Sequence, residues 1–210
     1  MIRGVIFDLD GVLIDSELHY LKRKIRFLAH YGIEWKPEMA YTYVGHRFSL
    51  QIPEIFPEKS EEELKEVMEY YWSVMHDPMD YNSIRMEGSN EVLRELKTKG
   101  YRLAIGSLST REKIDTVIRQ NHWEDLFDAT VSFNEVTKRK PDPEVYLKAM
   151  ELLGLQPEEC AVVEDSRVGI DAALASKACC IVRRENRYLC DQSGADIYID
   201  SLWDLPKVIK

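Results

Sequence analysis

The sequence has little cysteine and no apolar run long enough to cross a bilayer. Its four cysteines, Cys160, Cys179, Cys180 and Cys190, form no C-x-x-C pair. We therefore expect reduced, mostly buried thiols, and neither a cysteine metal site nor a catalytic thiol. The first residues lead directly into a strand-like segment, 5–7, and lack the layout of a signal peptide. These absences predict a cytoplasmic protein with no membrane partner.

Basic residues are also fewer than acidic residues. The sequence has 28 basic and 37 acidic residues, which gives a formal net charge of −9. A field of this sign repels polyanions, and the densest basic run, 138–140, is short. We therefore expect no nucleic-acid partner, and we expect a monomer. A small anionic substrate is compatible with this charge only if a metal ion and a few placed cations attract it locally.

Short, continuous apolar runs alternate with helical patterns over much of the 210 residues. Continuous runs of this kind are typical of strands that are covered on both faces, as in a parallel sheet. Four runs are clear, a fifth is weaker and a sixth suits an edge strand: 5–7, 103–105, 161–163, 180–182, 129–131 and 197–199. With the helices between them, these runs predict a doubly wound, Rossmann-like α/β domain.

The helices carry start signals. The pattern Ser-x-x-Glu, which is typical of a capping box, occurs at Ser60 and again at Ser109. Asp142 can cap a helix whose first residue is proline. Ser89 or Asn90 can cap an earlier helix, which carries Val92, Leu93 and Leu96 and stops at Gly100.

One region breaks the alternation of strands and helices. Residues 16–84 contain no convincing strand, and apolar side chains recur at helical spacing in 18–28 and in 64–75. We therefore predict a core domain formed by 1–15 and 85–210, with 16–84 inserted as a small helical domain.

The first strand ends in two carboxylates, Asp8 and Asp10, which Gly11 follows. Ligands of open α/β sheets bind beyond the carboxyl ends of the strands, so chemistry is expected here. Two negative charges this close require a bound cation or a proton. A polar turn is the structural alternative. A calcium loop of the EF-hand type would need a third acidic residue before its glycine, and flanking helices.

A second acidic pair, Glu164 and Asp165, follows another apolar strand. Asp165 or Ser166 could simply cap the next helix. Beside Asp8 and Asp10 at the same edge of the sheet, however, a shared Mg²⁺ is the better explanation, because this ion prefers hard oxygen ligands.

Two further strand ends carry polar residues. Ser107 follows the run 103–105, and Lys140 precedes Pro141. Taken alone, the serine suits a helix cap and the lysine suits a solvated surface. At neighbouring strand ends, the two would offer a hydroxyl donor and a cation to one phosphoryl group.

These residues, in this order, resemble the haloacid dehalogenase superfamily. The segment 8–15 looks like its first motif, Ser107 like the second, Lys140-Pro141 like the third and 164–166 like the fourth. The helical insertion is similar to that of the subclass with a C1 cap, which includes small-molecule phosphatases and β-phosphoglucomutases. The resemblance covers nearly the whole chain and implies a core with strand order 5-4-1-2-3.

The resemblance also implies a role for each residue. Asp8 would attack phosphorus to form an aspartyl-phosphate, and Asp10 would protonate the leaving oxygen and then activate water. Ser107 and Lys140 would hold the oxygens of the transferring phosphoryl group. The implied ligands of Mg²⁺ are Asp8, Asp10, Glu164 and Asp165.

We therefore predict a Mg²⁺-dependent phosphatase that acts on a small phosphorylated metabolite. A β-phosphoglucomutase-like phosphomutase is the alternative, although Thr110 stands where those mutases commonly have lysine. A dehalogenase would not require Asp10, and a non-catalytic phosphate-binding protein would not require the full set. Arg139 stands where the family usually has glycine before the third-motif lysine. In this layout the cap loops select the substrate, and His46 and Arg47 are the best candidates there.

Overall fold

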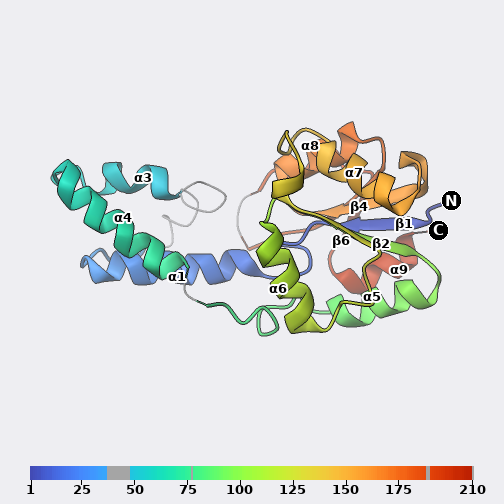
Figure 1. The fold of residues 1–210 in the computed structure, drawn as a ribbon, viewed down its shortest axis with the longest axis horizontal. Coiled ribbons are helices and arrows are strands. Elements are labelled where there is room, and N and C mark those ends of the chain that lie inside the picture. Colours follow the sequence, from blue (N-terminus) through green and yellow to red (C-terminus); the bar gives the residue numbers. More distant parts are fainter. Residues whose placement is uncertain (37–47, 77, 188–189, 210) are drawn as a thin grey trace. The chain divides into compact units, whose positions relative to one another are not determined.

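The fold is described from a computed structural model, which defines residues 1–36, 48–76, 78–187 and 190–209 (Figure 1). The chain divides into two compact units, one formed by Met1–Asp15 and Asp80–Lys210 and the other by Ser16–Met79. The range predicted for the helical insertion was 16–84. Among the residues that the structure describes, no helix combines the length and the apolar composition that a bilayer crossing requires.

The first unit is built on a parallel sheet of six strands. They are β1 (Gly4–Phe7), β2 (Arg102–Gly106), β3 (Ala129–Val131), β4 (Cys160–Glu164), β5 (Cys179–Arg183) and β6 (Ile197–Ile199). Their order is β3-β2-β1-β4-β5-β6, and all neighbours are parallel. The six expected strands and the strand order implied by the resemblance are thus confirmed, with β6 added beside β5.

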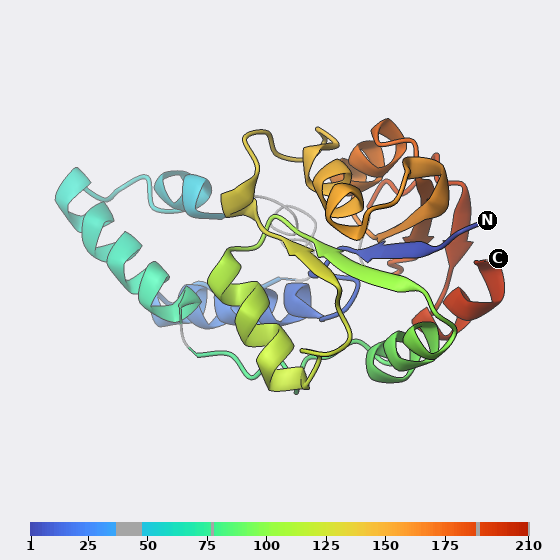
Figure 2. The ribbon, with the colours of Figure 1, turned by 45° about the vertical axis from the view of Figure 1, so that its right-hand side comes forward.

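Helices cover both faces of this sheet (Figure 2). The helices are α5 (Ser89–Thr98), α6 (Arg111–Asn121), α7 (Glu144–Leu153), α8 (Arg167–Ala175) and α9 (Leu205–Val208), with short 3₁₀ turns at Phe133–Glu135, Pro157–Glu159 and Leu202–Asp204. Val5 and Phe7 pack with side chains of α5, α6 and α9, whereas Ile6 packs with those of α7 and α8. Successive residues of β1 therefore face two separate apolar layers, which explains its continuous apolar run. The predicted doubly wound fold is confirmed.

The helix starts agree only in part with the sequence. Ser60 forms the expected capping box with Glu63 at the start of α4 (Glu61–Met75). At the start of α6, however, Thr110 is the cap, because its hydroxyl accepts from the Lys113 amide, so the expected cap at Ser109 is wrong. The N-cap residue of α5 is Gly88, which offers no side chain, so neither predicted cap there is correct.

The start of α7 differs from the prediction by one position. Pro143 is itself the cap residue, and the Asp142 carboxylate accepts from the Glu144 amide over 3.0 Å. Asp142 thus still supplies an acceptor to the first turn of the helix.

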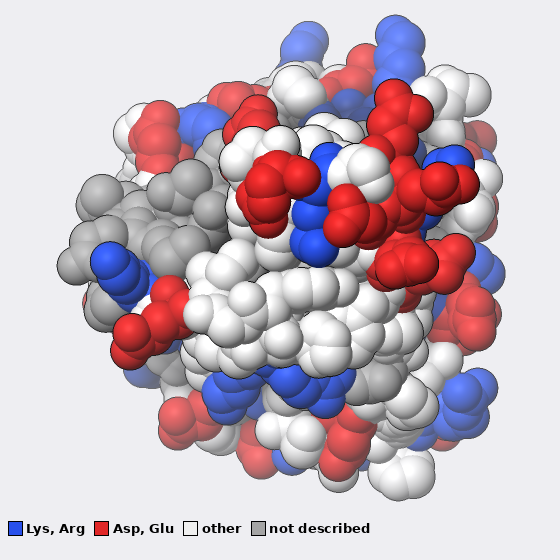
Figure 3. All heavy atoms as spheres, turned by 90° about the vertical axis from the view of Figure 1, so that its left-hand side faces the viewer, with Lys and Arg blue, Asp and Glu red and all other residues white. Residues whose placement is uncertain are grey.

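The second unit contains α1 (Ser16–His30), α3 (Phe48–Ile55) and α4. Its core is aromatic: the Phe27 ring lies edge-on to the rings of Phe48, Phe56 and Tyr71. The Arg23 guanidinium is buried and donates to the carbonyl of Met75 near the end of α4. On the face drawn in Figure 3, acidic and basic side chains are interspersed around a large uncharged area.

Within the first unit, the chain segments before and after the insertion run side by side. The Asp15 amide donates to the Ile84 carbonyl over 2.7 Å, and the Met86 amide donates to the Leu13 carbonyl over 2.9 Å. These bonds fix the position of the loop that follows β1, and this loop carries the first acidic motif.

Candidate active site

The sheet brings the predicted strand-end residues to one edge. Phe7 at the end of β1 is level with Ile105 of β2 and Val163 of β4. The residues that follow these strands therefore meet at the same carboxyl edge. One carboxylate oxygen each from Asp8, Glu164 and Asp165 lies within 4.8 Å of the others.

Lys140 is the cation at the centre of this cluster. Its ammonium nitrogen lies 2.6 Å from Oδ1 of Asp8 and 2.8 Å from Oε1 of Glu164, and it also donates to the Gly106 carbonyl. The side chain is only 4% exposed. Burial alone would lower the pKa of Lys140, but the two carboxylates outweigh burial and raise that pKa above its ordinary value. Lys140 is therefore charged at neutral pH.

Asp8 is more difficult to ionise than an ordinary aspartate. Burial raises the pKa of its carboxyl to about 7, although Lys140 acts in the opposite direction. The neighbouring carboxylates Glu164 and Asp10 also contribute to this rise of the pKa. An added cation beside Asp8 would favour the ionised form, which is the form that can act as a nucleophile.

Glu164 is fully buried, and both of its oxygens accept hydrogen bonds. Oε1 accepts from Lys140 and from the Tyr146 hydroxyl. Oε2 accepts from the Asp165 amide and from the amide and hydroxyl of Ser166. Burial raises the pKa of Glu164, but Lys140 and the other donors outweigh it, so the net shift is downward. These contacts suit a carboxylate that holds Lys140 and the loop after β4, and coordination of a metal by Glu164 stays a prediction.

The pKa of Asp165 shifts in the direction opposite to that of Glu164. Burial and the charges of Glu164 and Asp8 raise the pKa of Asp165 well above its ordinary value. The open question of the helix cap is answered by Ser166, whose hydroxyl accepts from the Gly169 amide over 3.2 Å. The Asp165 side chain is therefore not needed as a cap.

Gly11 explains why a glycine follows the two aspartates. It has φ +81°, and a Cβ placed there would lie 1.9 Å from Oδ2 of Asp165. Any other residue would be strained and would displace this carboxylate. The backbone of the first motif thus lies directly against Asp165.

This set of oxygens fits a divalent cation. The carboxylates of Asp8 and Asp165 are buried close together, and the pKa of each is raised. Burial and mutual repulsion make their ionised forms costly, and a cation between them would remove that cost. Hard oxygen ligands of this kind suit Mg²⁺.

Asp10 is bound by two residues that the sequence did not indicate as site residues. Its Oδ2 accepts from the Ser109 hydroxyl over 2.6 Å, and its Oδ1 lies 2.7 Å from the ammonium nitrogen of Lys113. The sequence pattern predicts Ser109 as a helix cap, and Lys113 lies in the first turn of α6. A useful signal was available, because α6 directly follows the strand end that carries Ser107.

Ser107 lies at its expected place after β2 and is buried. Its amide donates to the Val131 carbonyl, and its hydroxyl oxygen accepts from the Ser109 amide over 3.1 Å. Ser107 therefore shapes the same loop that brings Ser109 to Asp10. The substrate candidates His46 and Arg47 lie outside the residues that the structure describes.

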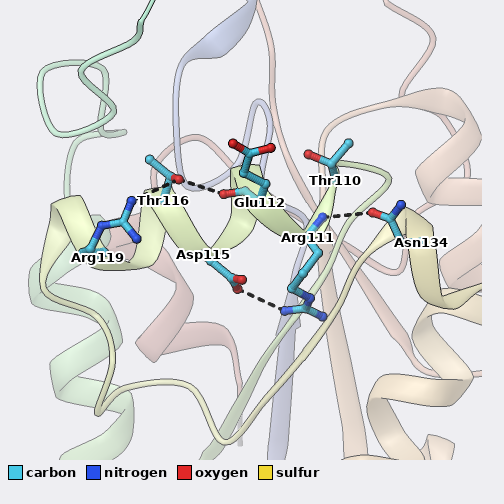
Figure 4. Close-up of a pocket in the computed structure, with 7 residues that line it drawn as sticks. All are labelled: Thr110, Arg111, Glu112, Asp115, Thr116, Arg119 and Asn134. Carbon is cyan, nitrogen blue, oxygen red and sulfur yellow. Dashed lines mark hydrogen bonds and ion pairs between the residues drawn. The ribbon is translucent and has the colours of Figure 1, made fainter.

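A hollow lies along α6 (Figure 4). Its lining is Thr110, Arg111, Glu112, Asp115, Thr116, Arg119 and Asn134. The Arg111 guanidinium contacts Asp115 and also bonds Thr130 and Glu135. None of the strand-end acids lines this hollow, so it is not the site predicted from the sequence.

Comparison with known proteins decides the family. The model of the haloacid dehalogenase-like hydrolases matches residues 5–182. The chain belongs to this family. The expected superfamily and enzyme class, a haloacid dehalogenase-like hydrolase, are thereby confirmed.

Two curated relatives of this hydrolase carry different activity names. A "phosphorylated carbohydrates phosphatase" of Thermotoga maritima is 34% identical over 179 residues, which cover 81% of this chain and 79% of that protein. A "pyrophosphatase PpaX" of Bacillus cereus is 27% identical over 212 residues, which cover 99% of this chain and 96% of that protein.

Solved structures of similar hydrolases share the fold over nearly the full length. A haloacid dehalogenase family hydrolase of Deinococcus radiodurans, solved with bound phosphate and sodium, has a TM-score of 0.79 at 27% identity and covers 97% of this chain and 93% of its own. A putative β-phosphoglucomutase of Thermotoga maritima has a TM-score of 0.78 at 27% identity and covers 99% and 100%.

Proposed function

We propose that this hydrolase is a Mg²⁺-dependent phosphatase that acts on a small phosphate ester through an aspartyl-phosphate at Asp8. The observation that carries the proposal is the buried pair of Asp8 and Lys140, whose charged atoms lie 2.6 Å apart at the carboxyl edge of the sheet. A carboxylate beside a fixed cation suits attack on an anionic phosphoryl group, because the cation offsets the repulsion between the two anions.

Asp8 would supply the nucleophilic oxygen. That oxygen forms a bond to phosphorus while the bond from phosphorus to the ester oxygen breaks, and the departing oxygen takes a proton from Asp10. Water then attacks the phosphorus of the aspartyl-phosphate, Asp10 takes a proton from this water, and phosphate leaves with Asp8 restored. Lys140 and Ser107 would hold the phosphoryl oxygens during both steps.

The chain would hold Mg²⁺ with Asp8, the Asp10 backbone carbonyl and Asp165. When bound, the ion would neutralise charge on the phosphoryl oxygens. Glu164 would keep Lys140 and the Asp165 loop in place through the hydrogen bonds described above.

The phosphatases among the relatives support a phosphorylated substrate for this chain as well. A screen of phosphate release should cover sugar phosphates, nucleotides, pyrophosphate and short phosphorylated acids, each with Mg²⁺ present. We expect release from at least one class, and we expect Asp8→Asn to abolish it. Asp171→Asn, which changes an exposed aspartate of α8, is the matched control and should retain activity. Phosphate release that persists in Asp8→Asn would remove Asp8 from the nucleophilic role.

A phosphomutase is the second candidate, and one observation favours it. Lys113 contacts Asp10 from one turn after Thr110. It could therefore supply the cation that the mutases commonly have as a lysine at the position of Thr110. Phosphorus NMR can follow release and isomerisation of β-glucose 1-phosphate in one reaction. We expect release to dominate, and isomerisation faster than release by about tenfold would favour the mutase instead.

A further inference from the structure

The carboxyl edge of the sheet carries two lysines with different partners. Lys140 lies between Asp8 and Glu164, and its side chain is 4% exposed. Lys113 contacts Asp10, and its side chain is 16% exposed. Asp8 and Asp10 therefore each have their own lysine, and the lysine of Asp10 is the one that solvent reaches more easily.

The two aspartates have different tasks in the proposed function, so their lysines also differ. Asp8 bonds to phosphorus, which puts Lys140 beside the transferring phosphoryl group. Asp10 must approach the departing oxygen to within a hydrogen-bond distance of about 3 Å. Because the ammonium of Lys113 lies 2.7 Å from Oδ1 of Asp10, it would be near the leaving group if Asp10 has the role proposed above.

The neighbouring residues of α6 do not duplicate this cation. The Arg111 guanidinium is engaged by Asp115, Thr130 and Glu135. Thr110 is neutral, and its hydroxyl caps the helix. Of these first residues of the helix, Lys113 is thus the one whose charge reaches Asp10.

The charges around Asp10 make this cation important for an anionic leaving group. Asp8, Asp10, Glu164 and Asp165 supply four carboxyl groups at this edge, and the whole chain has a net charge of −9. A leaving group with its own carboxylate or phosphate would be repelled by these acids. A nearby, partly buried ammonium would offset that repulsion with little screening by salt.

We infer that Lys113 is a specificity-determining residue that makes the site prefer esters whose leaving group is itself an anion. This inference rests on the proposed function, because it assigns the leaving-group side from the role of Asp10. Lys113 would attract the second anionic group, and Ser109 would keep its hydrogen bond to the other oxygen of Asp10.

A matched pair of substrates tests the inference. The leaving group of 2-phosphoglycolate carries a carboxylate, and that of 2-hydroxyethyl phosphate carries a neutral hydroxymethyl group at the same place. We expect kcat/KM of the unaltered enzyme with Mg²⁺ to favour phosphoglycolate by about tenfold or more. Lys113→Met should bring this ratio close to one, mainly by raising KM for phosphoglycolate. A disturbed Asp10 would lower kcat for both esters alike, so that loss cancels in the ratio.

Two further variants separate charge from structure. Lys113→Arg keeps the charge and should retain most of the preference, even if its kcat is lower. Lys97→Met breaks another lysine–aspartate pair of the same unit, in which Lys97 contacts Asp128 over 2.9 Å, and should leave the ratio unchanged.

The results can contradict the inference without contradicting the phosphatase. Equal kcat/KM for the two esters in the unaltered enzyme would overturn the role of Lys113, and so would a preference that survives in Lys113→Met. In both cases Asp8-dependent phosphate release would still stand. Phosphate release that survives in Asp8→Asn, by contrast, would overturn the proposed function itself.

Discussion

At the scale of single residues, Lys140 is held between two buried carboxylates. Asp8 and Glu164 each contact its ammonium group, and Glu164 is fully buried. A buried charge is costly unless it is paired, so each member of this trio depends on the others. Removal of one member would therefore leave an uncompensated buried charge.

Replacing Lys140 by methionine should test this dependence. The change leaves two buried carboxylates without their cation, and we expect the free energy of unfolding to fall by about 3–5 kcal/mol. Urea denaturation at neutral pH measures the loss. Lys97→Met removes a lysine from a more exposed pair and should cost no more than about 1 kcal/mol. Equal stabilities of the two variants would contradict the importance of the buried trio.

The raised pKa of Asp8 predicts a dependence of stability on pH. Since burial raises that pKa from 3.8 to about 7, the folded state holds a proton that the unfolded state has released between these values. Stability from this group is therefore lost as pH rises through this window. Asp8→Asn has no such loss.

We compare the free energy of unfolding of Asp8→Asn with that of the unaltered protein in the absence of divalent cations. The value for Asp8→Asn should rise relative to the unaltered protein between about pH 4 and pH 7, by on the order of 1–3 kcal/mol, and the difference should then level off. Chemical denaturation at several pH values in the presence of a chelator measures the difference. A constant difference across this range would contradict the raised pKa of Asp8.

At the scale of elements, the start of α6 shows what local sequence does not decide. Ser109 and Thr110 are adjacent and can both accept from a helix amide. Thr110 takes the cap, and the Ser109 hydroxyl donates to Asp10, which lies 99 positions away in the sequence. A capping pattern specifies the neighbourhood of a helix start, but long-range partners select the residue.

The first turn of α8 leads to a prediction for Gly169. A Cβ at this position would lie 1.7 Å from Oε1 of Glu164, so Gly169→Ala must displace the carboxylate that holds Lys140. We expect a loss of about 2 kcal/mol or more in stability, and a marked fall in kcat. Asp171→Ala, on the same helix, should stay within about 0.5 kcal/mol of the unaltered protein. Thermal and urea unfolding measure this loss. Unchanged stability of Gly169→Ala would contradict the close approach of Gly169 to Glu164.

At the scale of the whole molecule, the sheet was predictable because its strands have a strong and simple signal. Buried parallel strands give continuous apolar runs, and residues that follow aligned strands must meet at one edge. Asp8, Ser107, Glu164 and Asp165 lie at or directly after strand ends, and their meeting at one edge could be predicted in this way. Lys113 could not, because it lies seven positions after the end of β2, in the first turn of α6, and only the folded structure brings it to Asp10.

Divalent cations should affect both activity and stability of the whole protein. Excess chelator should abolish phosphate release, added Mg²⁺ should restore it, and Ca²⁺ should restore less because its coordination is larger and looser. At a concentration of about 100 times its dissociation constant, Mg²⁺ should add about 2.7 kcal/mol to the free energy of unfolding. Asp165→Asn should weaken this stabilisation. Full activity in excess chelator would contradict the assigned site.

The proposed mechanism requires that Asp8 becomes phosphorylated during turnover. Asp10→Asn should slow the attack of water on the phospho-enzyme, while acetyl phosphate, whose leaving group needs little protonation, should still react with Asp8. Borohydride reduces an aspartyl-phosphate to homoserine, and peptide mass spectrometry then locates the reduced residue. We predict homoserine at position 8 after incubation of Asp10→Asn with acetyl phosphate and Mg²⁺, followed by borohydride. The double variant that carries both Asp8→Asn and Asp10→Asn should give none. If the unaltered enzyme releases phosphate from acetyl phosphate but Asp10→Asn gives no homoserine at position 8, an aspartyl-phosphate at Asp8 is contradicted.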